Sequence, residues 1–137
     1  MRSLRRKRRV GTGLTELKSG STGSKTKSTI SLSEKAIETQ ILHFLNALPE
    51  CYAWKNHTTG VFDPTRGVFR RLGGYSIRGV SDILGIYRGK MICLEVKSAK
   101  GRLRPEQKEF LDKMHQLGAV TGVVRAVSEA QALLQGA

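Results

Sequence analysis

The chain has few of the residues that would place it outside the cell or in a membrane. It holds two cysteines, Cys51 and Cys93, and both lie in apolar, strand-like runs. This is typical of buried thiols in a reducing compartment such as the cytoplasm, and not of a disulfide-based fold. Neither cysteine is part of a CxxC pair, so the sequence does not indicate a zinc site. No run of about 18 apolar residues is present, so we expect no membrane span.

Acidic residues are also scarce. Eleven Asp and Glu stand against 24 Lys and Arg, which gives a formal net charge of +13. A polyanion, most simply nucleic acid, is the expected partner of such a chain. Residues 1–30 are basic, rich in Ser, Thr and Gly, and poor in apolar types, so the sequence predicts a disordered tail before a domain over 31–137. The basic cluster at 5–9 either contacts phosphates or is a solvated terminus.

Residues 79–97 have the pattern of a β-hairpin. Its two halves, 80–87 and 90–97, are rich in β-branched and apolar residues. The Arg88-Gly89 dipeptide between them fits a two-residue loop, because Gly tolerates positive φ. The sequence therefore predicts two antiparallel strands in which Tyr87 pairs with Lys90.

This register brings three charged side chains to one end of the hairpin. Asp82 lies opposite Glu95, with Cβ atoms about 5 Å apart, and Lys97 projects from the same face as Glu95. Charges in an apolar sheet are costly unless something compensates for them. A divalent cation such as Mg²⁺, bound by the two carboxylates, would compensate, and could activate a water and offset charge on a phosphoryl group. The alternative is a structural ion pair in which Lys97 neutralises Glu95.

The hairpin and the segment after it resemble the PD-(D/E)xK nuclease superfamily, and most closely its VRR-NUC branch. The matching residues are Gly79-Val80-Ser81-Asp82, Glu95-Val96-Lys97 and Arg102-Leu103-Arg104-Pro105-Glu106-Gln107. The resemblance runs from about Ser33 to the C-terminus. Ser81 is a departure, because the superfamily has Pro before the Asp. The resemblance implies a small α/β nuclease that cuts phosphodiester bonds with Mg²⁺ or Mn²⁺.

The resemblance also implies roles and partners. Asp82 and Glu95 would be metal ligands, Lys97 would position the attacking water or stabilise developing charge, and Gln107 would support Lys97 or that water. Free-standing members imply a homodimer that cuts branched DNA, such as four-way junctions, during replication, recombination or repair in the cytoplasm of a bacterial or phage-infected cell. The competing interpretation is a non-catalytic nucleic-acid-binding module that kept the fold.

Two predicted helices each carry a polar residue on an apolar face. The segment 32–48 has apolar residues at helical spacing, and Glu34 lies on that stripe. Similar nucleases place a Glu on this helix as a further metal ligand; the alternative is a capping box with Ser31. Pro105 begins a second helix that ends before Gly118. Gln107 lies on its inward face, unless it is an ordinary first-turn residue that faces solvent.

The remaining segments complete a mixed α/β fold. Residues 51–57 and 119–125 are predicted strands, and Ser128 is predicted to cap a helix over 129–134. The order of elements is αβββαβα, a mixed sheet flanked by helices. The long Gly- and Arg-rich segment 58–79 is either a DNA-contacting loop or a plain surface loop. The cations that we expect at DNA are Arg66, Arg70, Arg71, Arg78, Lys100, Arg102 and Arg104.

Overall fold

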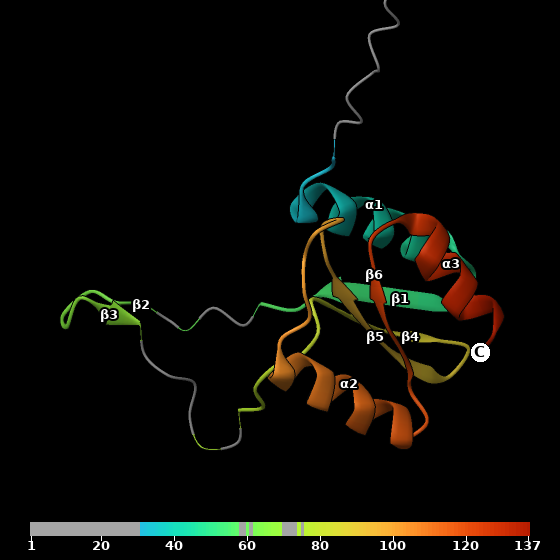
Figure 1. Cartoon of the computed structure of the whole chain (residues 1–137). Helices are drawn as coiled ribbons and strands as arrows, with labels where there is room; N and C mark the ends of the chain where they lie inside the picture. Colours follow the sequence, from blue (N-terminus) through green and yellow to red (C-terminus); the bar gives the residue numbers. More distant parts are fainter. Residues whose placement is uncertain (1–30, 58–59, 61, 70–73, 75) are drawn as a thin grey trace, which may run out of the picture.

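The structure is a computed structural model that describes residues 31–57, 60, 62–69, 74 and 76–137 (Figure 1). The predicted tail, 1–30, lies outside the described residues, and so do Arg70 and Arg71. The elements in chain order are α1 (Glu34–Ala47), β1 (Cys51–Lys55), β2 (Phe62–Asp63), β3 (Val68–Phe69), β4 (Ile83–Tyr87), β5 (Lys90–Val96), α2 (Pro105–Gln116), β6 (Val120–Val124) and α3 (Val127–Gln135).

The described chain forms a mixed α/β fold. Four strands make the main sheet in the order β1-β4-β5-β6. The β1/β4 and β4/β5 pairs are antiparallel, and the β5/β6 pair is parallel. Helices α1 and α3 lie on one side of the sheet and α2 on the other (Figure 1). The predicted mixed α/β fold, a mixed sheet with helices on both sides, is therefore confirmed. No helix in the described part of the chain has the length and apolar character that a membrane span needs.

The predicted hairpin register is confirmed. Tyr87 pairs with Lys90 and Ile83 with Leu94. The loop residues Arg88 and Gly89 have φ of 48° and 78°, and positive φ at both positions is the geometry of the type I′ turn that matches the strand twist. This turn fixes which residues of β4 and β5 share a face.

Alternation along β5 divides the interior into two cores. Ile92, Leu94 and Val96 face the core that α1 and α3 cover. Cys93 faces a smaller core beneath α2, together with Leu111. Because side chains alternate along a strand, Glu95 points to the α2 side. Glu95 is thus on the side of the sheet that α2 covers, and not on the side of α1.

The structure does not contain the capping box that was the alternative for Glu34, and the predicted serine cap of the last helix is wrong. The N-cap of α1 is Ser33, whose side chain accepts a hydrogen bond from Ala36 N at 3.3 Å, so Ser31 forms no capping box with Glu34. Helix α3 begins at Val127, and Ser128 lies inside its first turn. In place of a serine cap, a Glu129 carboxylate oxygen accepts from Arg125 N at 2.6 Å.

The predicted long loop contains a small element that the sequence pattern missed. Strands β2 and β3 pair as a separate two-stranded sheet, drawn away from the helices and the main sheet in Figure 1. The Phe62 and Phe69 rings meet edge to face with centroids 5.3 Å apart. Strands of two residues are too short to leave a periodic signal in the sequence.

Candidate active site

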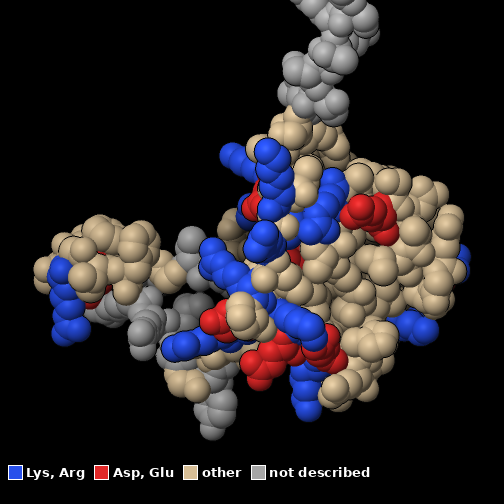
Figure 2. Space-filling view, in the orientation of Figure 1, with Lys and Arg blue, Asp and Glu red and all other residues tan. Residues whose placement is uncertain are grey.

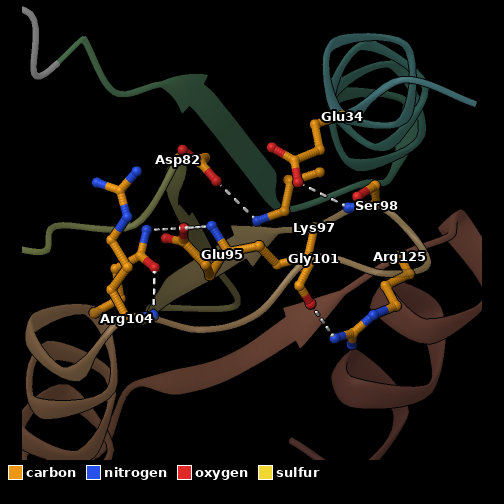
Figure 3. Close-up of polar contacts among 10 residues, drawn as sticks. Glu34, Asp82, Glu95, Lys97, Ser98, Gly101, Arg104 and Arg125 are labelled. Carbon is orange, nitrogen blue, oxygen red and sulfur yellow. Dashed lines mark hydrogen bonds and ion pairs between the residues drawn. The ribbon is translucent and has the colours of Figure 1, made fainter.

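The structure brings Asp82 and Glu95 together. Asp82 immediately precedes β4, and the register of Ile83 with Leu94 continues to place it opposite Glu95. An Asp82 carboxylate oxygen (Oδ2) accepts a hydrogen bond from Val96 N at 2.9 Å, which fixes the carboxylate against β5. The Glu95 side chain is fully buried, and Figure 3 shows both carboxylates on the same side of the hairpin.

One oxygen of Glu95 is held by two donors. Lys97 Nζ donates to Oε1 at 2.7 Å, and Gln107 Nε2 donates to the same atom. Gln107 also accepts from Arg104 N at 2.9 Å, which closes the first turn of α2. Gln107 therefore faces the site and not solvent. Its direct partner is Glu95, whereas the resemblance implied support for Lys97 or a water.

The other oxygen of Glu95, Oε2, has no hydrogen-bond partner among the described residues, although it is buried. A buried carboxylate oxygen without a donor is costly. Burial raises the pKa of Glu95, and the nearby charge of Asp82 raises it further, while the hydrogen bond from Lys97 acts against both. Glu95 is therefore protonated more readily at this site than it is in water.

A glycine allows the Asp82 segment to approach α2. Gly79 has φ +72°, and a Cβ added there would lie 2.2 Å from Glu106 O. Only Gly combines that conformation with this contact at low cost. Gly79 thus lets the segment before Asp82 pass close to the backbone of the first turn of α2. That turn carries Gln107, which donates to Glu95.

Glu34 is hydrogen-bonded to the segment that follows Lys97. Its Oε1 accepts from Ser98 N at 3.0 Å, in the segment that follows Lys97 (Figure 3). A Cβ added to Gly101 would lie 2.9 Å from the same oxygen. Among the residues that the structure describes, no group of three or more His, Cys, Asp or Glu is arranged to hold a metal ion. The structure therefore offers a two-carboxylate site, with Glu34 bracing the segment beyond it.

Basic side chains lie on the segment that follows the site in the chain. The segment between β5 and α2 carries the exposed cations Lys100, Arg102 and Arg104, and Arg125 ties it to the end of β6 by donating to Gly101 O at 3.1 Å. Figure 2, in the orientation of Figure 1, shows Lys and Arg side chains gathered across the middle of the visible face of the molecule. Two other predicted contacts, Arg66 and Arg78, are also exposed.

Asn56 is a neighbour of the site that sequence reasoning did not select. Its backbone N–H donates to Asp82 O at 2.7 Å, so it continues the β1/β4 pairing and lies beside Asp82 on the same face. Its Nδ2 is buried with no hydrogen-bond partner in the described part of the chain. Only the β1/β4 register, which the sequence does not fix, reveals this position.

The comparisons with known proteins leave the site to be interpreted from its own chemistry. No protein-family model, no curated protein and no solved structure matches the chain. The donor set fits a hard divalent cation, because two carboxylates lie together and one buried oxygen has no donor. Mg²⁺ is commonly bound by one or two carboxylates while it keeps several waters.

Proposed function

We propose that the protein is a Mg²⁺- or Mn²⁺-dependent nuclease with a PD-(D/E)xK fold of VRR-NUC type, which hydrolyses phosphodiester bonds in DNA. The observation that carries this proposal is the buried, unpartnered Oε2 of Glu95 beside Asp82. A structural ion pair with Lys97 would account for Oε1 and leave Oε2 without a partner. A cation shared with Asp82 gives Oε2 the partner that it lacks, in place of the proton that the two carboxyl groups share when Glu95 is protonated.

Asp82 and Glu95 would hold the cation, which when bound lowers the pKa of an attacking water and offsets the charge of the scissile phosphate. Lys97 is 11% exposed and uses one donor on Glu95. An ammonium has three donors, so the remaining two are available to a water or a phosphate oxygen. Gln107 keeps the Glu95 side chain in one rotamer and thereby sets the direction of Oε2.

The charge distribution supports DNA as the substrate. The chain carries a formal net charge of +13, and exposed cations border the site. Such contacts give salt-dependent binding to the DNA backbone. Cutting branched DNA on two strands is simplest with two symmetric sites, so a homodimer acting on junctions or related structures in the cytoplasm belongs to this proposal.

One observation favours a second candidate. The described residues provide two carboxylates and no third metal-binding side chain. A protein that kept the fold and the basic surface, but binds metal too weakly for catalysis, would be a nucleic-acid-binding module. The two candidates differ in whether a divalent cation makes the protein cut DNA.

The test uses the full chain with labelled four-way junction, flap, nicked and plain duplex DNA, in Mn²⁺, Mg²⁺ or excess chelator. We compare wild type with Asp82→Asn, which keeps an acceptor for Val96 N. Asp112→Asn on the exposed face of α2 is the matched control. We expect metal-dependent cutting that falls by at least about 100-fold in Asp82→Asn, with unchanged DNA affinity and circular dichroism.

The other outcomes separate the candidates. Wild-type protein that binds the DNAs tightly and cuts none of them with either metal is the binding module. Equal cutting in excess chelator, or equal cutting by Asp82→Asn, contradicts the proposed site.

A further inference from the structure

The α2 side of the sheet is covered unevenly. Helix α2 packs against β5 and β6, whereas β1 and β4 present large apolar side chains to solvent. Tyr52 is 74% exposed, Ile86 49% and Trp54 40%. Tyr52 pairs with Ile86 across the two strands, and the Tyr52 and Trp54 ring centroids are 6.2 Å apart. These three residues are called the aromatic face below.

The aromatic face continues into the candidate site. Trp54 pairs with Leu84, and Leu84 packs into the core beneath α2, so Trp54 lies on the same side of the sheet as Asp82. Asn56 is two residues beyond Trp54 and neighbours Asp82. A step of two residues along a strand covers about 7 Å, which is about the length of two stacked nucleotides.

We propose that the aromatic face is a stacking platform for unpaired bases beside the cleaved phosphodiester, and that it selects DNA with single-stranded or splayed nucleotides at the cut. This inference rests on the proposed nuclease function. Aromatic side chains beside a basic groove are the usual means of binding single strands, because every base offers a flat face.

Charge around the aromatic face suits a nucleic-acid strand. Neither β1 nor β4 contains an acidic residue. The exposed Arg78 lies in the segment that leads to Asp82, and Figure 3 shows the Arg104 guanidinium on the Asp82 side of the site. Cations at the site can hold the backbone while the rings of Tyr52 and Trp54 hold the bases.

The size of the face argues against a second copy of the chain as its occupant. An aromatic side chain buries at most about 250 Å², and Tyr52, Ile86 and Trp54 are only partly exposed, so together they offer less than roughly 500 Å². A stable protein interface buries about 800 Å² on each partner. One or two bases need only the two rings.

The test exploits Trp54, which is the only Trp in the chain. Intrinsic fluorescence of the full-length protein is titrated, in excess chelator so that no cutting occurs, with flapped DNA, single-stranded DNA and blunt duplex of matched length. Binding is measured in parallel by anisotropy of labelled DNA. We expect Trp54 emission to be quenched at saturation by the flapped and single-stranded DNAs, and to change little with blunt duplex.

Variants separate stacking from general binding. Tyr52→Ala should weaken binding of flapped DNA by about 10-fold or more, with little effect on blunt duplex. Trp54→Phe should keep most of the affinity, because a ring remains. Leu117→Ala, at an exposed apolar residue beyond the end of α2, is the control and should match wild type for both DNAs; circular dichroism confirms that each variant is folded.

Equal Trp54 emission with all three DNAs at saturation, or equal affinity of Tyr52→Ala and wild type for flapped DNA, overturns the platform. A concentration-dependent emission change without DNA, together with dimer sedimentation that Tyr52→Ala abolishes, would assign the face to a second copy and also overturn it. Quenching in a protein that never cuts DNA supports the platform and rejects the nuclease. Cutting of DNA without quenching of Trp54 emission supports the nuclease and rejects the platform.

Discussion

Glu95→Gln separates a metal site from a structural ion pair. The amide oxygen of Gln can still accept from Lys97 and Gln107, as Glu95 Oε1 does, so the surrounding contacts are kept. What disappears is the negative charge beside Asp82. If that charge serves a cation, the variant should lose the stabilisation that Mn²⁺ gives to the wild type.

The size of the effect follows from mass action. Mn²⁺ at ten times its dissociation constant stabilises the folded state by about 1.4 kcal/mol. For a domain of roughly 100 residues, 1 kcal/mol shifts the melting temperature by about 4 °C or more. We therefore expect Mn²⁺ to raise the melting temperature of wild type by about 6 °C or more, and that of Glu95→Gln by less than about 1 °C. Differential scanning fluorimetry across a Mn²⁺ series measures both.

The shift should also depend on pH. Because the pKa of Glu95 is raised by burial and by Asp82, this residue favours the metal-free fold most below the ordinary Glu pKa, and that contribution is lost as pH rises through the raised pKa. A cation must displace the proton. The Mn²⁺-induced rise in melting temperature should therefore be larger at pH 8 than at pH 5.5 in wild type.

Glu109→Gln is the matched control, because Glu109 is an exposed carboxylate on α2. It should show the wild-type Mn²⁺ shift at each pH. If Glu95→Gln also keeps the full shift, or if wild type shows no shift at any Mn²⁺ concentration, Glu95 is not a metal ligand and the reasoning fails.

Two further substitutions test how the site is built. Gly79→Ala should destabilise the fold by about 2–4 kcal/mol, because the new Cβ meets the α2 backbone and the residue has positive φ. Gly74→Ala is the control and should leave stability unchanged, because a Cβ added at Gly74 meets nothing within 4 Å. Urea unfolding measures the stability of both variants. Gln107→Ala should weaken Mn²⁺ binding by about 10- to 100-fold in calorimetry, because Glu95 loses a donor that orients it; equal affinities for Gln107→Ala and the exposed Gln116→Ala would contradict this role.

Local patterns predicted the hairpin and the second helix well. The Arg88-Gly89 turn and the alternation of β5 sufficed to fix the register that brings Asp82 to Glu95. Pro105 and Gly118 bound the second helix as expected. In these segments, turn geometry and helix-end preferences act on neighbouring residues, so the sequence carries the information directly.

Features that depend on distant contacts were not predictable. Glu34 contacts Ser98, 64 residues away, and no spacing rule along the first helix selects that partner over a cap. The near-continuous apolar run over 119–125 is typical of a buried strand, yet only Val124 of β6 is buried, since β6 is an edge strand whose exposure depends on the order of strands in the sheet. Asn56 likewise enters the site only through the pairing of β1 with β4.

The most direct test of the metal site is anomalous scattering from a crystal of the full chain soaked in Mn²⁺. The account predicts one strong anomalous peak at the Mn edge, between the Asp82 carboxylate and Glu95 Oε2, and no such peak in Glu95→Gln crystals. A site without manganese at saturating concentration, with Oε2 instead held by an ordered water or another side chain, would contradict it.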